Sequence, residues 1–217
     1  MRRGAAREFL KRMRLLPIAI LVAACATCGC ARPDAVAAST ASNAQLTHLY
    51  NEDQSDREGD VDWPRVLTRD GVRRAQVNTM LQEGTLHSAQ DYLHAAMICQ
   101  HGSRFEEARL AQALAIVAMT IDPHNEQARW LAAASLDRML TYKHQPQWYG
   151  TQYSADAKGV YLYPTSDQAV TDDERRELHA PTLAEARAKV AEMAAMSHLP
   201  VRASPPTLEE LQATRAD

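Results

Sequence analysis

The sequence predicts a mainly α-helical domain, an antiparallel helical bundle with a small β-hairpin after it. In residues 88–140, apolar side chains recur at spacings of three and four in three successive blocks, which is the period of amphipathic helices. Turn-forming residues separate the blocks, at His101-Gly102-Ser103 and at Asp122-Pro123-His124-Asn125. Further on, Thr151-Gln152-Tyr153 and Val160-Tyr161-Leu162-Tyr163 are typical of two short strands around a turn.

Two more helices are expected before these blocks. Ser42 with Gln45 has the spacing of a capping box, and the helix that it starts should fade near Gly59. The second helix should begin around Asp62-Trp63-Pro64, because proline is tolerated in the first turn, and Gly84 should end it. The helical domain therefore begins at about residue 43.

The three central helices each have a predicted buried stripe. Ser88 caps the first of them, Asp91 lies in its first turn, and Gly102 supplies its stop. The predicted buried positions are Tyr92, Ala95, Ala96 and Cys99, then Phe105, Ala108, Leu110, Ala111, Leu114, Val117, Ala118 and Ile121, then Ala128, Leu131, Ala132, Ser135, Leu136 and Met139. Alanine recurs in all three helices, which lets helix axes approach closely.

The C-terminal part should contain two short capped helices. Thr171 with Glu174 and Thr182 with Glu185 have capping-box spacing. We expect the helical domain to span residues 43–196. Residues 197–217 should form a loose tail with at most one turn of helix, at Thr207 to Leu211, because Pro200, Pro205 and Pro206 disfavour regular structure.

Residues 1–24 have the features of a signal peptide. They hold six of the 24 basic residues and one of the 27 acidic ones, all of them before Leu15. The last ten residues of this segment, Leu15 to Ala24, are uncharged. Ten residues are too few to span a bilayer but suit an apolar signal segment. Residues 7–11 are similar to the end of a twin-arginine signal, but Ala6 breaks the arginine pair, which favours general secretion.

Val22-Ala23-Ala24-Cys25 resembles a bacterial lipobox, which implies lipidation of Cys25 and a flexible tether over residues 25–42. Cys28 is a weaker second candidate, and cleavage after Ala37 is the alternative without a lipid. The expected location is the bacterial cell envelope. The protein would be an outer-membrane lipoprotein facing the periplasm, or a periplasmic protein if it is cleaved after Ala37.

Without residues 1–24 the chain has 18 basic and 26 acidic residues, a formal charge of −8. So acidic a domain disfavours nucleic acid as a partner. The expected partners are the membrane, through the lipid, and an unknown small ligand or protein. We predict no cofactor and no metal site, because His87, His94 and His101 are each two helical turns, about 10 Å, apart. Motifs for a nucleophile elbow, a phosphate loop or a dinucleotide fold are absent from the sequence.

Charged residues interrupt the predicted buried stripes, and such residues are costly to bury unless they are paired. Either they form an internal ion-pair network, or they converge on a pocket that binds a ligand; a third possibility is that the helices bury less at those turns. The candidate ligand-binding residues are Asp53, Gln54, Arg57, Asp70, Arg73, Gln100, Arg138, Gln147, Thr151 and Gln152. The loop around Gln147–Gln152 could equally satisfy its own backbone through its side-chain amides.

His101 ends a predicted helix, where its simplest role is to cap the last carbonyl groups. The functional alternative makes it a general acid or base oriented by a carboxylate, with Asp137 as the first candidate and Asp53 or Asp70 as others. That alternative corresponds to a hydrolase-like or transferase-like enzyme, whereas the ion-pair arrangement corresponds to a purely structural or interaction module.

Several short motifs together resemble an uncharacterised bacterial family of unknown function. They are Asn51-Glu52-Asp53-Gln54-x-Asp56-Arg57, Asp91-Tyr92 with Ala95-Ala96, Gln100-His101-Gly102, Asp137-Arg138, Gln147-x-Tyr149-Gly150-Thr151-Gln152 and Asp173-x-x-Arg176. The resemblance implies no reaction, but it implies that these polar residues act as a set. In addition, Ala111, Ala118 and Pro123 resemble a tetratricopeptide helical hairpin, without the three repeats that an array needs.

Overall fold

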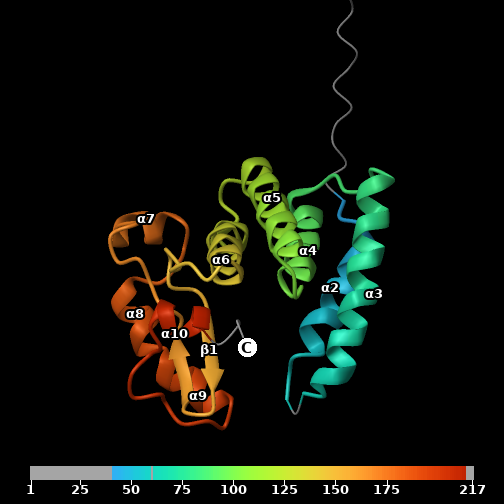
Figure 1. The fold of residues 1–217 in the computed structure, drawn as a ribbon. Helices are drawn as coiled ribbons and strands as arrows, with labels where there is room; N and C mark the ends of the chain where they lie inside the picture. Colours follow the sequence, from blue (N-terminus) through green and yellow to red (C-terminus); the bar gives the residue numbers. More distant parts are fainter. Residues whose placement is uncertain (1–40, 60, 214–217) are drawn as a thin grey trace, which may run out of the picture. The chain divides into compact units, whose positions relative to one another are not determined.

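The computed structural model describes residues 41–59 and 61–213, which form a helical bundle followed by a β-hairpin and short helices (Figure 1). This confirms the predicted fold class. The elements are α2 (Ala44–Ser55), α3 (Trp63–Gln82), α4 (Ala89–Gln100), α5 (Phe105–Ile121), α6 (Glu126–Tyr142), β1 (Tyr153–Asp156), β2 (Gly159–Leu162), α7 (Asp172–Glu177), α8 (Leu183–Ala188), α9 (Val190–Met196) and α10 (Leu208–Ala213). The predicted signal peptide, Cys25 and most of the predicted tether lie outside the described residues.

Helix α4 is the centre of the hydrophobic core, because α2, α3, α5 and α6 all pack against it. It is buried around its whole circumference from Leu93 to Gln100, rather than along the single stripe that the sequence predicted. The difference arises because two pairs of helices cover opposite faces of α4. Cys99 is a free, buried cysteine, as predicted, and burial raises its pKa to about 12. On α5 the predicted positions Ala111 and Ala118 are fully buried, but Val117 and Ile121, which we also predicted to be buried, are exposed.

The predicted helix starts are correct with one exception. Asn43, not Ser42, caps α2, because the Asn43 side chain accepts a hydrogen bond from the backbone N–H of Leu46. Asp62 caps α3, and Ser88 with Asp91 forms a capping box at α4. The Asp91 carboxylate also accepts from the backbone N–H of Asn43 at 2.6 Å, so it joins the start of α2 to the start of α4.

The hairpin pairs β1 with β2 in antiparallel register from Tyr153 opposite Leu162 to Asp156 opposite Gly159. Its turn is only two residues long, so each strand extends further towards the turn than the sequence predicted. Beyond β2, the backbone N–H of Val160 donates to Pro200 O, and Arg202 N–H donates to Val160 O. Residues 200–202, which we assigned to a loose tail, are therefore hydrogen-bonded to the sheet, since the free edge of β2 offers unpaired backbone groups.

The predicted capping boxes at Thr171 and Thr182 are both present. The second of them starts two short helices, α8 and α9, which meet at Lys189, where the sequence predicted a single helix. Within residues 41–59 and 61–213, no helix is both long enough and apolar enough to cross a bilayer.

Candidate functional site

The charged residues of α2 and α3 are paired with one another. The Arg57 guanidinium lies 3.1 Å from an oxygen of the Asp53 carboxylate and 2.6 Å from one of Asp70, so it bridges the two helices. Arg73 lies 2.7 Å from Asp70 and also pairs with Asp56. Asp53, Asp70 and Arg73 are almost completely buried. These residues thus form the internal ion-pair network, the first of the two arrangements that the sequence left open.

His101 joins this network from the C-terminal end of α4. Its ring Nδ1 lies 2.8 Å from Asp53 Oδ2, and Gln54 Nε2 donates to the same oxygen at 2.8 Å. Burial raises the pKa of Asp53, but His101, Arg57 and Gln54 together outweigh burial and hold this pKa below its usual value. Asp53 therefore stays ionised and orients the imidazole. The partner of His101 is Asp53, not Asp137, which we had named first.

Asp137 instead holds the loop that follows α6. Its Oδ1 accepts from the backbone N–H groups of Trp148 and Tyr149 at 2.8 and 3.0 Å, and its Oδ2 accepts from the N–H and the hydroxyl of Thr151. Burial raises the pKa of Asp137 more than these four hydrogen bonds lower it. Because all contacts of the Asp137 carboxylate with the described residues are to this loop, Asp137 has a structural role and does not orient His101.

Gln147 fixes the same loop from within. Its Nε2 donates to the carbonyl oxygens of Gln152 and Tyr163, and its Oε1 accepts from the backbone N–H of Gln152 at 2.8 Å. Gln147 is fully buried. This is the self-satisfied turn that the sequence analysis gave as one of two alternatives for residues 147–152, and it makes the loop a rigid platform for Gln152.

Two predicted site residues from distant parts of the chain meet on α6. The amide Nε2 of Gln100, at the end of α4, donates to Ala134 O at 3.2 Å, and Nε2 of Gln152 donates to the same oxygen at 3.1 Å. In an α-helix this oxygen also faces the backbone N–H four residues on, which here belongs to Arg138. The two amides therefore lie at the level of Arg138.

Arg138 lies in one row with Ala134 and Tyr142, at spacings of four, on a single face of α6. The Tyr142 hydroxyl donates to Gly102 O at 2.7 Å, so both ends of this row contact the segment 100–102. Arg138 itself is half-buried and has no carboxylate or other hydrogen-bond partner for its side chain among the described residues; its Nε is buried. Every other arginine that we predicted in the site is ion-paired.

Gln100 carries a second unsatisfied group. Its side chain is only 3 % exposed, and its Oε1 has no hydrogen-bond partner within the part of the chain that the structure describes. A buried carbonyl oxygen without a donor costs free energy, on the order of 1–3 kcal/mol. The Gln100 acceptor, the Arg138 donor and the partly exposed imidazole of His101 make up what we call the Arg138 site, together with the Gln152 amide.

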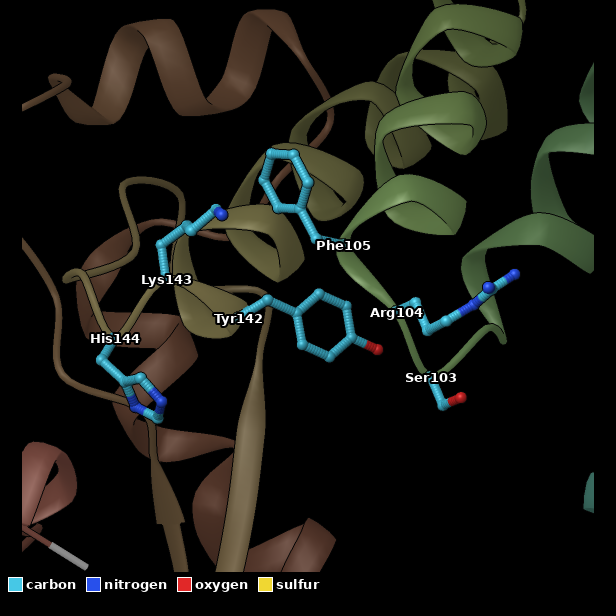
Figure 2. Close-up of a pocket in the computed structure, with 6 residues that line it drawn as sticks. All are labelled: Ser103, Arg104, Phe105, Tyr142, Lys143 and His144. Atoms are coloured by element: carbon cyan, nitrogen blue, oxygen red, sulfur yellow. The ribbon is translucent and has the colours of Figure 1, made fainter. Parts of the chain in front are cut away.

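A pocket of about 430 Å³ adjoins the end of the same row. It is lined by Ser103, Arg104, Phe105, Tyr142, Lys143 and His144. Figure 2 shows the Tyr142 ring directed from α6 towards the segment before α5. The Lys143 ammonium lies 4.4 Å from the centre of the Phe105 ring, a cation–π contact that closes one wall.

Sequence reasoning missed two residues that shape the site. Tyr142 lies four residues after Arg138, and this helical spacing could have indicated it. Arg175 is 2 % exposed and donates to Trp148 O at 2.8 Å, which supports the loop 147–152 from α7. No local signal distinguishes Arg175 from its exposed neighbour Arg176, because only the tertiary structure brings α7 to the loop.

The described residues contain no group of three or more His, Cys, Asp or Glu side chains arranged to hold a metal ion. Comparisons with family models, with curated proteins and with solved structures find no match to this chain. The resemblances to an uncharacterised bacterial family and to a tetratricopeptide hairpin therefore stay predictions.

Proposed function

We propose that this protein binds a small acid at the Arg138 site. The observation that carries the proposal is a pair of unsatisfied groups. Arg138 Nε and Gln100 Oε1 are both buried without a partner among the described residues, and the Gln100 amide donates to Ala134 O, one helical turn before Arg138 on α6. The carboxylates nearby, Asp53 and Asp137, are by contrast fully engaged by hydrogen bonds. A buried polar group without a partner calls for an explanation, and a bound ligand is one that fits here.

The two groups together define the class of ligand. Arg138 would pair with a carboxylate or a phosphate, for which a guanidinium offers several donors at once. Gln100 Oε1 accepts, so the ligand should carry a donor next to its anionic group, such as a hydroxyl or an ammonium. A hydroxy acid, an amino acid or a phosphate monoester with a free hydroxyl meets both requirements, and a simple monocarboxylate meets only one.

The surroundings favour a preformed site. The loop that supplies Gln152 is fixed by Asp137 and Gln147, and His101 is fixed by Asp53. Groups that are already oriented lose little conformational entropy on binding, which increases affinity.

The test is thermal unfolding of the mature protein with L-lactate, L-serine, glycerol 3-phosphate or acetate. We expect at least one of the first three to raise Tm by about 5–10 °C at 100 times its dissociation constant, and acetate to do less. Arg138→Met should abolish the shift. The matched control is Arg176→Met, which removes an arginine that is exposed and paired only with Asp173. If no probe shifts Tm, or if Arg138→Met keeps the shift, the site does not bind acids and the structural-module alternative is favoured.

Acid–base catalysis at the same site is the second candidate, and the Asp53–His101 pair favours it. With Nδ1 directed at Asp53, His101 Nε2 has no hydrogen-bond partner among the described residues, and the side chain is 20 % exposed. A carboxylate that orients an imidazole in this way is common to many hydrolases. Hydrolysis of p-nitrophenyl acetate or p-nitrophenyl phosphate that disappears in both His101→Gln and Asp53→Asn would support an enzyme. The same hydrolysis in His101→Gln as in the wild type would rule out this role.

We further propose that the domain is exported and anchored to the bacterial outer membrane by a lipid on Cys25. The support is the basic start, the apolar residues 15–24 and the small residues before Cys25. Radiolabelled palmitate fed to cells expressing the full chain should label the wild type and not Cys25→Ala. Label that persists in Cys25→Ala would exclude this anchor, and a mature N-terminus at Ala38 would establish cleavage instead.

A further inference from the structure

A second pocket, of about 600 Å³, lies between α6, the loop at Gly150–Thr151 and the helices α8 and α9. It shares no residue with the Arg138 site. Its volume is within the range of small-molecule sites, about 300–1,000 Å³.

Aromatic and apolar side chains form much of its lining. Trp130 comes from α6, Tyr153 from β1 and Met193 from α9. The Tyr153 hydroxyl donates to Ala186 O at 3.0 Å, which fixes the ring in position. A half-buried indole and a fixed phenol ring offer flat apolar surfaces whose contact area costs little side-chain entropy.

Rigid backbone at Gly150 and Thr151 forms another part of the wall. Gly150 has φ +76°, and a Cβ atom there would lie 3.0 Å from Ala186 Cβ, so the loop packs directly on α8. Thr151 is held by both its N–H and its hydroxyl on Asp137. The pocket is therefore preformed rather than dependent on a mobile loop.

The rim carries opposite charges one helical turn apart. Glu185 uses Oε2 to cap α8 at Thr182, and its other oxygen has no partner among the described residues. Lys189 has no ion-pair partner in residues 41–59 and 61–213. An anion in the pocket would meet Glu185 and a cation would meet Lys189, whereas hydroxyl groups can donate to the carboxylate and accept from the ammonium at the same time.

We propose that this pocket binds a neutral sugar, with the apolar face of one pyranose ring on Trp130 and its hydroxyl groups on Glu185 and Lys189. An aromatic surface with one negative and one positive side chain at the rim favours a neutral sugar, whereas the Arg138 site favours an acid. A disaccharide fits the volume better than a single ring, because one pyranose would leave much of the pocket empty.

Saturation-transfer NMR on the mature protein tests this inference, with methyl β-D-glucoside, N-acetylglucosamine, cellobiose and maltose as probes. We expect saturation of ring protons of at least one sugar, with a dissociation constant that rises about tenfold in Trp130→Leu. Trp130→Phe keeps an aromatic face and should lose less. Trp63→Leu is the matched control, because Trp63 is 55 % exposed on α3, outside this pocket, and its loss should leave binding unchanged.

Glu185→Gln and Lys189→Met change exposed side chains and leave the core untouched, so each variant should fold. Each should weaken binding by about threefold to tenfold, the net loss expected for one ordinary hydrogen bond. Saturation of none of the four sugars would overturn the proposal. So would saturation transfer that is equal in Trp130→Leu, or preferential binding of L-phenylalanine, whose two charges also match the rim. Because Arg138→Met leaves this pocket intact, sugar binding that persists in that variant separates this site from the proposed acid site.

Discussion

Gln100 and Gln152, 52 positions apart in the chain, donate their side-chain amides to a single acceptor, the carbonyl oxygen of Ala134. This shared acceptor joins the end of α4, the middle of α6 and the loop after α6. The shared oxygen also lies one helical turn before Arg138 on α6. The geometry of the candidate site therefore depends on how firmly the loop 147–152 is held.

The loop should detach when Asp137 is removed. Asp137→Ala leaves three backbone N–H groups and the Thr151 hydroxyl without their acceptor, so we expect a loss of about 3 kcal/mol in the free energy of unfolding. Urea denaturation followed by circular dichroism measures it. Asp173→Ala, which removes a carboxylate that is 91 % exposed, should change the stability by less than about 0.5 kcal/mol. Equal effects of the two substitutions would contradict the structural role of Asp137.

Removal of Asp53 should be as costly for a different reason. Asp53→Ala takes away the carboxylate that accepts from Arg57 and His101 and leaves buried positive charge less well compensated. For a buried pair that loses one partner, the loss is about 3–5 kcal/mol. Chemical denaturation should show a lower midpoint with an unchanged slope. A double substitution with Asp70→Ala should be non-additive, since both carboxylates contact Arg57.

Acidification should destabilise the protein through His94. This imidazole is buried and stacks on Tyr50 at 4.1 Å between ring centres; burial lowers its pKa from 6.5, more than the nearby charge of Asp91 raises it. Well above pH 6.5 the histidine is neutral in both the folded and the unfolded chain, and the stability is at its full value. As the pH falls below 6.5, the unfolded chain takes up a proton that the folded protein resists, so the free energy of unfolding decreases.

His94→Phe keeps the stacking on Tyr50 and removes the titration, so it should flatten the pH dependence of stability between pH 6.5 and 5. His48→Gln is the control, because His48 is 73 % exposed. The carboxylates with lowered pKa values, among them Asp53, Asp91 and Glu107, lose their contribution as the pH falls below their unfolded values of 3.8 for aspartate and 4.5 for glutamate, outside this window. An unchanged slope in His94→Phe would refute the assignment.

Replacing Gly102 or Gly71 by alanine should change the free energy of unfolding in opposite directions. A Cβ atom at Gly102 would lie 2.5 Å from Glu107 Cβ, so Gly102→Ala forces the α4–α5 turn apart and should cost about 1–3 kcal/mol. Gly71 lies inside α3 with nothing within 4 Å of the added atom, and Gly71→Ala should gain about 0.5–1 kcal/mol. Thermal unfolding of both variants measures the pair. A gain at Gly102 would show that the close approach of Glu107 is not required.

The sequence alone determined the elements of this fold, because helix period, capping residues and turn residues are local. Asp62, Ser88, Thr171 and Thr182 each begin the helix that their spacing predicted. The cap at Asn43 instead of Ser42 is an error of one residue between two good capping residues. The sequence pattern could not predict the break between α8 and α9, because Lys189 is compatible with one continuous helix as well as with two short ones.

Only the tertiary structure decided which polar residues meet. The pattern marked Asp53, Asp137 and Arg138 as out of place on apolar faces and put His101 at a helix end, but periodicity contains no information about pairing between elements far apart in sequence. Side-chain contacts put Asp53, not Asp137, on His101, committed Asp137 to the loop, and left Arg138 without a partner among the described residues. That division follows from physics: local backbone preferences determine where a helix begins, whereas the partner of a buried charge depends on which helix packs against it.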